Sequence, residues 1–113
     1  MKLPNWENAY IPPPKLKDYL LSETHTVGKS KAKFFRGLGF NEFNIEMLEQ
    51  GLIAIAHTEE VKEVVSSLHG IKYVVDGWLP TPDERQVMAR TVWIIEINQE
   101  TPRLVTAYPL EPS

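Results

Sequence analysis

The sequence contains no cysteine, so disulfide bonds, thiolate metal sites and thiol nucleophiles are all excluded. Its histidines lie far apart and show no metal-ligand spacing; they are His25, His57 and His69. No apolar run approaches the roughly 20 residues that cross a bilayer, and the N-terminal residues lack the apolar stretch of a signal peptide. We therefore expect a soluble, cytoplasmic protein with no membrane segment, no metal site and no cofactor.

Nucleotide-binding glycine loops, zinc patterns and nucleophile elbows are also absent from the sequence. The acidic residues are spread along the third predicted helix and the turns and do not suggest catalysis by paired carboxylates. Any catalytic site must therefore be assembled from isolated polar residues.

Charge is distributed unevenly along the chain, which carries a formal net charge of -3. Residues 1–40 contain seven Lys and Arg against three acidic residues, whereas residues 41–113 contain five against twelve. A local basic patch on an acidic body can bind an anion, although an ordinary solvated helix face explains the same charges.

The length of 113 residues is typical of one domain, which we expect to span residues 1–113. Prolines predict an extended arm over residues 1–13 that packs Trp6, Tyr10 and Ile11 onto the body. A helical part over residues 14–57 is expected to follow.

Periodicity predicts three helices, over residues 14–23, 28–38 and 41–56. In the second helix the basic stripe consists of Lys29, Lys33 and Arg36, and the apolar side of Phe34, Phe35 and Leu38. Lys31 falls inside the apolar arc, where a charge must either snorkel or serve a purpose. In the third helix, Asn41 or Asn44 is the expected cap, and the buried stripe consists of Ile45, Leu48, Leu52 and Ile55.

The remaining residues, 58–113, are expected to form a sheet. Residues 59–68 are ambiguous, because their spacing fits an amphipathic helix while their valines favour a strand. Three later runs, 71–79, 85–97 and 102–110, are rich in β-branched and aromatic residues and are separated by turn signals. The predicted fold class is α+β, with three N-terminal helices covering one face of a four-stranded antiparallel meander.

Polar residues interrupt the apolar strands. Alternation places Arg90, Val92, Ile94 and Glu96 on one face of their strand and Thr91, Trp93 and Ile95 on the other. It likewise places Leu104, Thr106 and Tyr108 together. If Arg90 and Tyr108 share the open face of the sheet and the His25 loop reaches over it, the set suits phosphodiester chemistry. No metal is needed when the nucleophile is the 2′-hydroxyl of RNA.

Each of these residues also has an ordinary structural explanation. His25 can cap a loop, and Lys31 can snorkel. Arg90 can pair with Glu96 or another acid across strands, and Tyr108 can be a core aromatic with a solvated hydroxyl. His57 and His69 fit a helix end and a turn, and neither is assigned a role.

Four stretches resemble an uncharacterised bacterial domain family: "KLKDYLL", "HTVGKSKAKFFRGLGF", "IKYVVDG" and "RTVWII...PRLVTAYP". Members of that family occur as small free-standing proteins and as the C-terminal module of polymorphic toxins, and the resemblance runs from about Leu3 to Pro109. The order of helices and meander is similar to the metal-independent ribonuclease fold of barnase, the colicin D tRNase and the RelE toxins. The resemblance thus implies a toxin-type ribonuclease.

The resemblance picks out His25, Lys31 and Arg90, and its closing "TAY" supplies Thr106 and Tyr108. We expect His25 to act as general base or acid. Lys31 and Arg90 are expected to stabilise the phosphoryl transition state, and Tyr108 to orient the scissile group or assist proton transfer. The residues expected to bind substrate are Lys29, Thr91, Arg103 and Thr106.

Two functions follow as alternatives. The first is a metal-independent endoribonuclease that acts on RNA, with tRNA as a candidate substrate, in a toxin–antitoxin-like pair. As a free-standing copy without a delivery protein, the chain is expected to belong to an intracellular pair, or to be a relic that has lost activity, rather than to be a secreted toxin module. The second is a non-catalytic module that binds an antitoxin or immunity protein, or a second copy of itself, with Trp6, Trp78 and Trp93 as candidate anchors.

Overall fold

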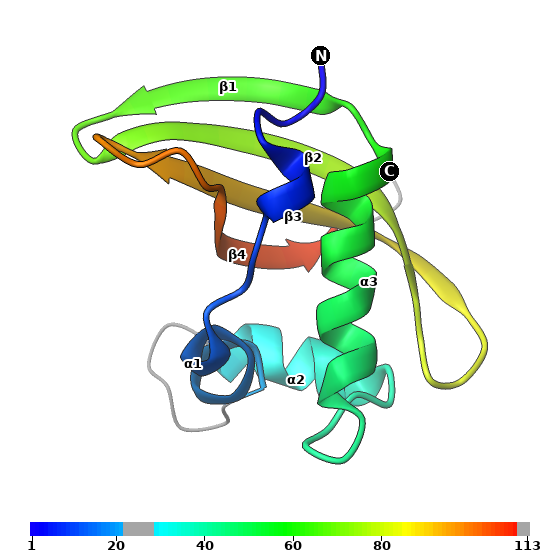
Figure 1. The fold of residues 1–113 in the computed structure, drawn as a ribbon. Helices are drawn as coiled ribbons and strands as arrows, with labels where there is room; N and C mark the ends of the chain where they lie inside the picture. The colour runs from blue at the N-terminus through cyan, green and yellow to red at the C-terminus, as the bar shows by residue number, and fades with distance from the viewer. Residues whose placement is uncertain (22–28, 111–113) are drawn as a thin grey trace.

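The computed structural model describes residues 1–21 and 29–110, and for residues 18, 19 and 29–31 it describes the backbone alone. Helices come first and a four-stranded antiparallel sheet follows, which confirms the predicted α+β class (Figure 1). The strand order is β1-β2-β3-β4, so the sheet is the predicted meander.

The helical part contains η1 (Trp6–Asn8), α1 (Pro13–Lys15), the π-helical turn η2 (Leu16–Leu20), α2 (Lys29–Gly37) and α3 (Ile45–Thr58). The strands are β1 (Val61–Ser67), β2 (Gly70–Pro80), β3 (Gln86–Glu96) and β4 (Arg103–Pro109). The ambiguous stretch 59–68 therefore contains a strand, in agreement with its valines.

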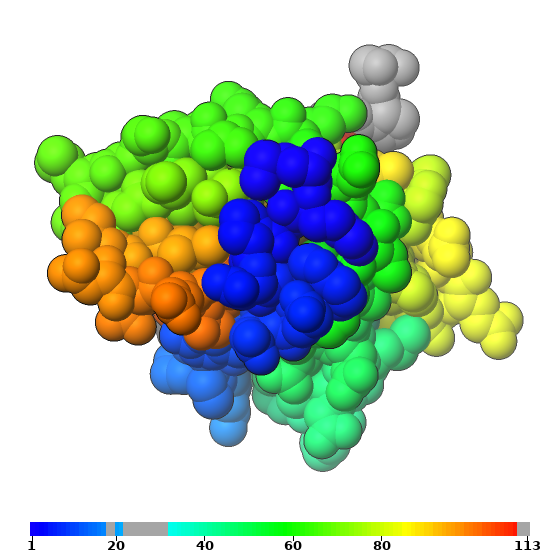
Figure 2. Space-filling model, turned by 45° about the horizontal axis from the view of Figure 1, so that its top comes forward, coloured from blue at the N-terminus to red at the C-terminus, as the bar shows by residue number. Residues whose placement is uncertain are grey.

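The N-terminal arm packs onto the body, but it is not extended throughout. Ile11 is buried, and the partly buried Trp6 meets the ring of His57 edge-on at 5.2 Å between ring centroids. Tyr10, expected to pack its side chain, is exposed and pairs through its backbone with the edge of β4. The amide of Leu104 donates to the Tyr10 carbonyl at 3.1 Å. Figure 2 shows the arm in blue between β1 and α3.

The first predicted helix is α-helical only in α1, and it continues as the π-helical turn η2. Pro13 and Pro14 open α1, where a missing amide hydrogen costs little. The amide of Leu21 then donates to the carbonyl of Leu16 at 2.9 Å, the spacing of a π turn. This turn buries Leu16, Leu20 and Leu21 against the core.

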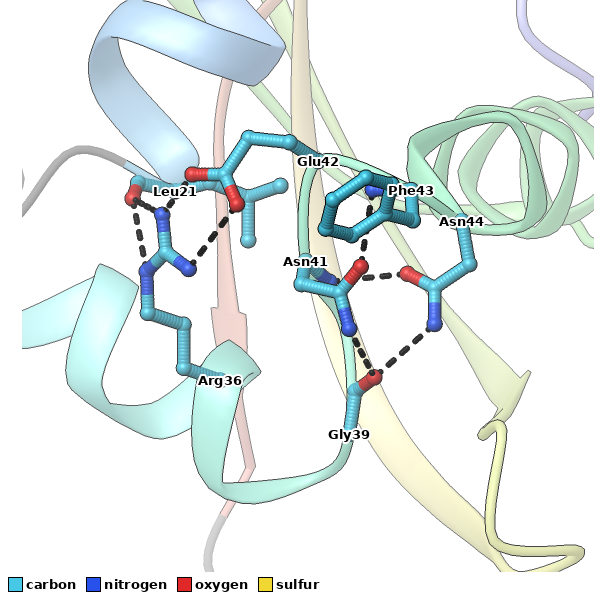
Figure 3. A network of polar contacts seen from close by, with 7 residues as sticks. All are labelled: Leu21, Arg36, Gly39, Asn41, Glu42, Phe43 and Asn44. Carbon is cyan, nitrogen blue, oxygen red and sulfur yellow. Dashed lines mark hydrogen bonds and ion pairs between the residues drawn. The ribbon is translucent and has the colours of Figure 1, made fainter.

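Arg36, assigned to the exposed stripe of the second helix, instead anchors three segments. Its guanidinium donates to the Leu21 carbonyl at 2.7 and 3.0 Å and to the Glu42 carboxylate (Figure 3). Hydrogen bonding from Arg36 lowers the pKa of Glu42 to about 2. Arg36 therefore joins η2, α2 and the start of the next connection.

The turn between α2 and α3 is held by two asparagines (Figure 3). The side chain of Asn44 accepts from the Asn41 amide at 2.8 Å and donates to the Gly39 carbonyl at 2.9 Å. Asn44 occupies the N-cap position of α3 but makes no side-chain capping bond, so the predicted capping role is wrong. Its side chain stabilises the preceding turn instead.

Helix α3 covers β2 and β3 through its predicted apolar stripe (Figure 1). Leu48, Leu52 and Ile55 are buried, and Ile45 is partly buried against the same core. The helix approaches β2 closely at Gly77, where an added Cβ would lie 3.0 Å from side-chain atoms of Ile55 and Glu59. The main core therefore lies between the helices and one face of the sheet.

The two faces of the sheet carry different side chains. Val75, Trp93 and Ala107 point into the main core, as alternation predicts for β2 and β3. In β4 the prediction that Leu104 shares a face with Thr106 and Tyr108 is wrong. Val92 pairs with Thr106 while the next residue, Trp93, pairs with Leu104, so Val105 is an extra residue that forms a β-bulge.

Candidate functional site

The face of the sheet that points away from the helices carries a row of polar side chains from three adjacent strands. Asp76 of β2 is opposite Arg90 of β3, and Arg90 is opposite Tyr108 of β4. We call this face the open face, and the three residues the polar row. The structure thus brings together two of the predicted catalytic residues, Arg90 and Tyr108, and adds Asp76, which sequence reasoning did not single out.

Arg90 is held by a bidentate ion pair. Its Nε and one Nη donate to the two carboxylate oxygens of Asp76 at 2.8 and 2.9 Å. The side chains are 28% exposed for Arg90 and 11% for Asp76, so the pair is shielded from solvent without being enclosed. Two parallel hydrogen bonds fix the plane of the guanidinium as well as its position.

Electrostatics keep the Arg90 guanidinium charged. Hydrogen bonding to Asp76 is the largest cause that raises the pKa of Arg90, and hydrogen bonding to Tyr108 adds to it. Two of the five N–H groups are committed to Asp76 and the guanidinium also hydrogen-bonds to Tyr108, so that only the N–H groups left over can donate to a second anion or acceptor. In the polar row, Asp76 therefore fixes the direction of the Arg90 donors, and its negative charge largely balances the positive charge of Arg90.

The suggested partner of Arg90, Glu96, is occupied elsewhere. Arg103 donates its Nε to Glu96 at 2.8 Å, near the opposite end of the open face from the polar row. Thr106 lies nearer, two residues along β4 from Tyr108 and on the same face. Among the predicted substrate-binding residues of the strands, Thr106 is the one that neighbours the polar row.

Thr91 lies on the other face, which corrects its predicted role in substrate binding. It is completely buried, its hydroxyl donates to the Val75 carbonyl at 2.6 Å, and it accepts from the Trp93 indole at 2.7 Å. Because both hydrogen-bonding directions are used inside the core, Thr91 has a structural role.

The basic segment that resembles the toxin family is described only in part. His25 lies outside the described residues, as do the side chains of Lys29 and Lys31. The backbone of both lysines belongs to α2, whose buried Ala32 and Phe35 face the helix side of the sheet. The helix that carries the lysines and the polar row are thus on opposite sides of the sheet.

A pocket of about 650 Å³ adjoins the polar row at Asp76. It opens where β1 ends its pairing with β2 at Val75, so that the edge of β2 beyond this point has no neighbouring strand among the described residues. The lining consists of residues 58–62, Asp76, Gly77, Trp78, Met88 and Leu110. Neither the pocket nor Asp76 was predicted, although a hairpin register through the turn at 81–85 places Asp76 opposite Arg90.

The three tryptophans differ in their ability to anchor a partner. Trp93 is fully buried, so its prediction as an anchor is wrong. Trp6 is partly buried in the packing of the arm. Trp78 is 59% exposed and lines the pocket, which makes it the tryptophan most accessible to a ligand.

Within residues 1–21 and 29–110, no three His, Asp or Glu side chains lie close enough together to hold a metal ion. No helix in that part of the chain has the length and apolar character needed to cross a membrane.

A chain of the contact-dependent growth inhibition toxin–immunity protein complex from Klebsiella pneumoniae 342 has a similar structure. The TM-score is 0.72, the match covers 95% of this chain and 97% of that chain, and the sequences are 14% identical. At this identity the similarity shows a shared fold.

No curated protein matches the sequence. A family model does match it over residues 2–111, which is nearly the whole chain. The chain therefore belongs to the family described as "Domain of unknown function (DUF6883)".

Proposed function

We propose that the protein is a toxin-type endoribonuclease that cleaves RNA without a metal ion and is paired with an inhibitor protein. The observation that carries this proposal is the polar row, in which Asp76 orients Arg90 beside Tyr108 on the open face. The fold shared with a chain of a toxin–immunity complex supports such a setting.

In the proposed reaction the 2′-hydroxyl of RNA attacks the adjacent phosphorus atom. A general base takes the hydroxyl proton, the bond to the 5′-oxygen breaks, and a general acid protonates that oxygen, leaving a 2′,3′-cyclic phosphate. Arg90 donates its remaining N–H groups to the phosphoryl oxygens as their charge grows, and Tyr108 donates its hydroxyl to the same group. Asp76 is a positioning residue that acts through Arg90.

Proton transfer is assigned to His25 from the sequence alone, because imidazole titrates near neutral pH. His25 lies outside the described residues, and the His25→Ala variant tests whether it acts at the polar row. The proposal does not use Lys29 or Lys31 at the phosphate, since their helix lies on the other side of the sheet. The acidic body of the protein favours a small footprint on RNA, because each neutralised phosphate needs a cationic contact.

The test is cleavage of total tRNA and of a panel of RNAs by the purified chain in EDTA, read on denaturing gels. Arg90→Lys should lose activity because lysine cannot reproduce the bidentate geometry, and Tyr108→Phe and His25→Ala should each lose roughly 100-fold or more. Arg85→Lys is the matched control, since Arg85 forms an exposed ion pair with Asp83 at the β2–β3 turn. Thermal unfolding of each variant separates lost activity from lost folding.

Two results would contradict the proposal. One is a wild-type chain that cleaves no RNA and does not inhibit growth when expressed without a neighbouring inhibitor gene. The other is cleavage that the Arg90, Tyr108 and His25 variants retain at the level of the Arg85 control.

A second candidate function is partner binding without catalysis. It is favoured by apolar side chains exposed around the β1–β2 hairpin, where Leu68 is 91% exposed; the others are Val64, Val65 and Ile71. The partner would be an inhibitor protein or a second copy of the chain. Light scattering should then give a dimer or a stable complex that Val64→Lys dissociates, and a monomer that forms no complex would exclude it.

A further inference from the structure

The pocket beside the polar row has the dimensions of a small-molecule site. Its volume of about 650 Å³ lies within the usual range for ligand pockets, roughly 300–1,000 Å³. It exists because β1 departs from β2 at a bulge: Val61 pairs with Val75, Glu63 pairs with Val74, and Lys62 is the extra residue. The gap is therefore built into the backbone of the sheet.

One wall of the pocket is an exposed indole. Trp78 is opposite Met88 in the β2–β3 pairing and shares the open face with Asp76. The Trp78 side chain is exposed, and contact between its indole ring and water is unfavourable. A planar ligand that stacks on the ring removes this contact. Nucleobases stack on aromatic side chains, and stacking tolerates every base because each has a π-face. Met88 and Leu110 add apolar contacts beside the indole.

The segment that leads into β1 supplies the pocket with one acceptor and one donor. Glu60 and Lys62 both line the pocket and are exposed, so a carboxyl group and an amino group are available beside it. The hydrogen-bonding edge of a nucleobase presents N–H groups and acceptor atoms side by side. With Glu59 and Asp76 the lining holds three acidic residues against Lys62, which disfavours another phosphate in this space.

The spacing links the pocket to the polar row. The Trp78–Met88 pair lies two residues along the strands from the Asp76–Arg90 pair, which corresponds to about 6.6 Å. That separation is comparable with the distance between the phosphate and the base of one nucleotide.

We propose that the pocket is a base subsite in which one nucleobase of RNA stacks on Trp78 while the adjoining phosphate is held at Arg90. This inference rests on the proposed ribonuclease function and gives that site its substrate-recognition element. Alanine has no ring on which a base can stack, so Trp78→Ala should weaken the binding of a nucleotide about 5- to 150-fold.

The experiment measures binding of the 3′-monophosphates of adenosine, guanosine, cytidine and uridine to the full chain by calorimetry, with inorganic phosphate as the probe of Arg90 alone. We expect Trp78→Ala to weaken nucleotide binding while leaving phosphate binding unchanged, and Trp78→Phe to restore most of it. Glu60→Gln should change the order of preference among the four bases, because it replaces a carboxylate, which only accepts hydrogen bonds, by an amide, which both donates and accepts them. Phe43→Ala is the matched control, since Phe43 is exposed far from the pocket in the turn before α3.

The outcomes separate the subsite from the ribonuclease. Nucleotide binding that depends on Trp78 in a chain that cuts no RNA would support the pocket and refute the proposed function. RNA cleavage that is unchanged in Trp78→Ala and shows no base preference would refute the pocket and leave the function standing. Nucleotide affinities equal in the Trp78→Ala and Phe43→Ala variants would also overturn the base subsite.

Discussion

Replacing Thr91 by valine tests the buried hydrogen-bond chain that joins the Trp93 indole, the Thr91 hydroxyl and the Val75 carbonyl. Both bonds are short, at 2.7 and 2.6 Å, and Thr91 and Trp93 are completely buried. Valine has nearly the same shape as threonine, so the substitution removes hydrogen bonding without opening a cavity. The effect on stability therefore reports the polar contacts alone.

Two costs add in Thr91→Val. The Trp93 N–H is left without an acceptor inside the core, which costs about 1–3 kcal/mol, and loss of the bond to the Val75 carbonyl costs about 0.5–1.5 kcal/mol more. We expect the free energy of unfolding to fall by about 2–4 kcal/mol. For a chain of this size that corresponds to a drop of roughly 10 °C in Tm.

Urea denaturation followed by circular dichroism measures this change, and two variants make it specific. Thr91→Ser keeps the hydroxyl and loses one methyl group, so it should cost only about 1 kcal/mol. In a Trp93→Phe background, which lacks the indole donor, Thr91→Val should cost about 1–3 kcal/mol less than in wild type. If Thr91→Val is no more destabilising than Thr91→Ser, the account of this network is wrong.

Three further predictions concern the rest of the fold. Gly70→Ala should destabilise by about 2 kcal/mol or more in urea denaturation, because its φ is +149° and a Cβ there would lie 2.3 Å from the Ile95 carbonyl oxygen; a stable variant would contradict this geometry. The pKa of Glu42 is lowered from 4.5 to about 2, so its contribution to stability is complete above pH 4.5 and is lost as the pH falls towards 2. Denaturation at a series of pH values should show this loss, and Glu42→Gln should reduce it. Phe43→Ser, at a fully exposed site, should change stability by less than about 0.5 kcal/mol.

Periodicity predicts much of the fold because burial here follows simple repeats. The apolar stripe of α3 and the alternation of β3 both place residues where the structure has them, with Leu52 and Trp93 in the core. Alternation fails at Leu104 because the bulge at Val105 shifts the alternating pattern by one residue. The sequence of one strand does not reveal this shift, because a bulge is defined by the pairing with the neighbouring strand. The Asn44 cap fails because the side chain has a competing backbone partner in its own turn.

The candidate site is predictable only where strand pairing determines it. Arg90 and Tyr108 meet on one face because their strands are adjacent in the meander. The partner of Arg90 depends on the register of β2 against β3, which selects Asp76 rather than Glu96. The pocket depends on where β1 leaves the sheet, a tertiary feature that composition and spacing do not encode.

The bulge at Val105 gives β4 two independent halves. Without the extra residue, one alternating pattern would run through the strand, and a side chain suited to the core at Leu104 would commit Thr106 to the same side. With it, Leu104 lies in the hydrophobic core while Thr106 and Tyr108 lie on the open face. Thr106 and Tyr108 can thus be substituted on the open face while Leu104 and Ala107, which contribute to stability, keep their places in the core.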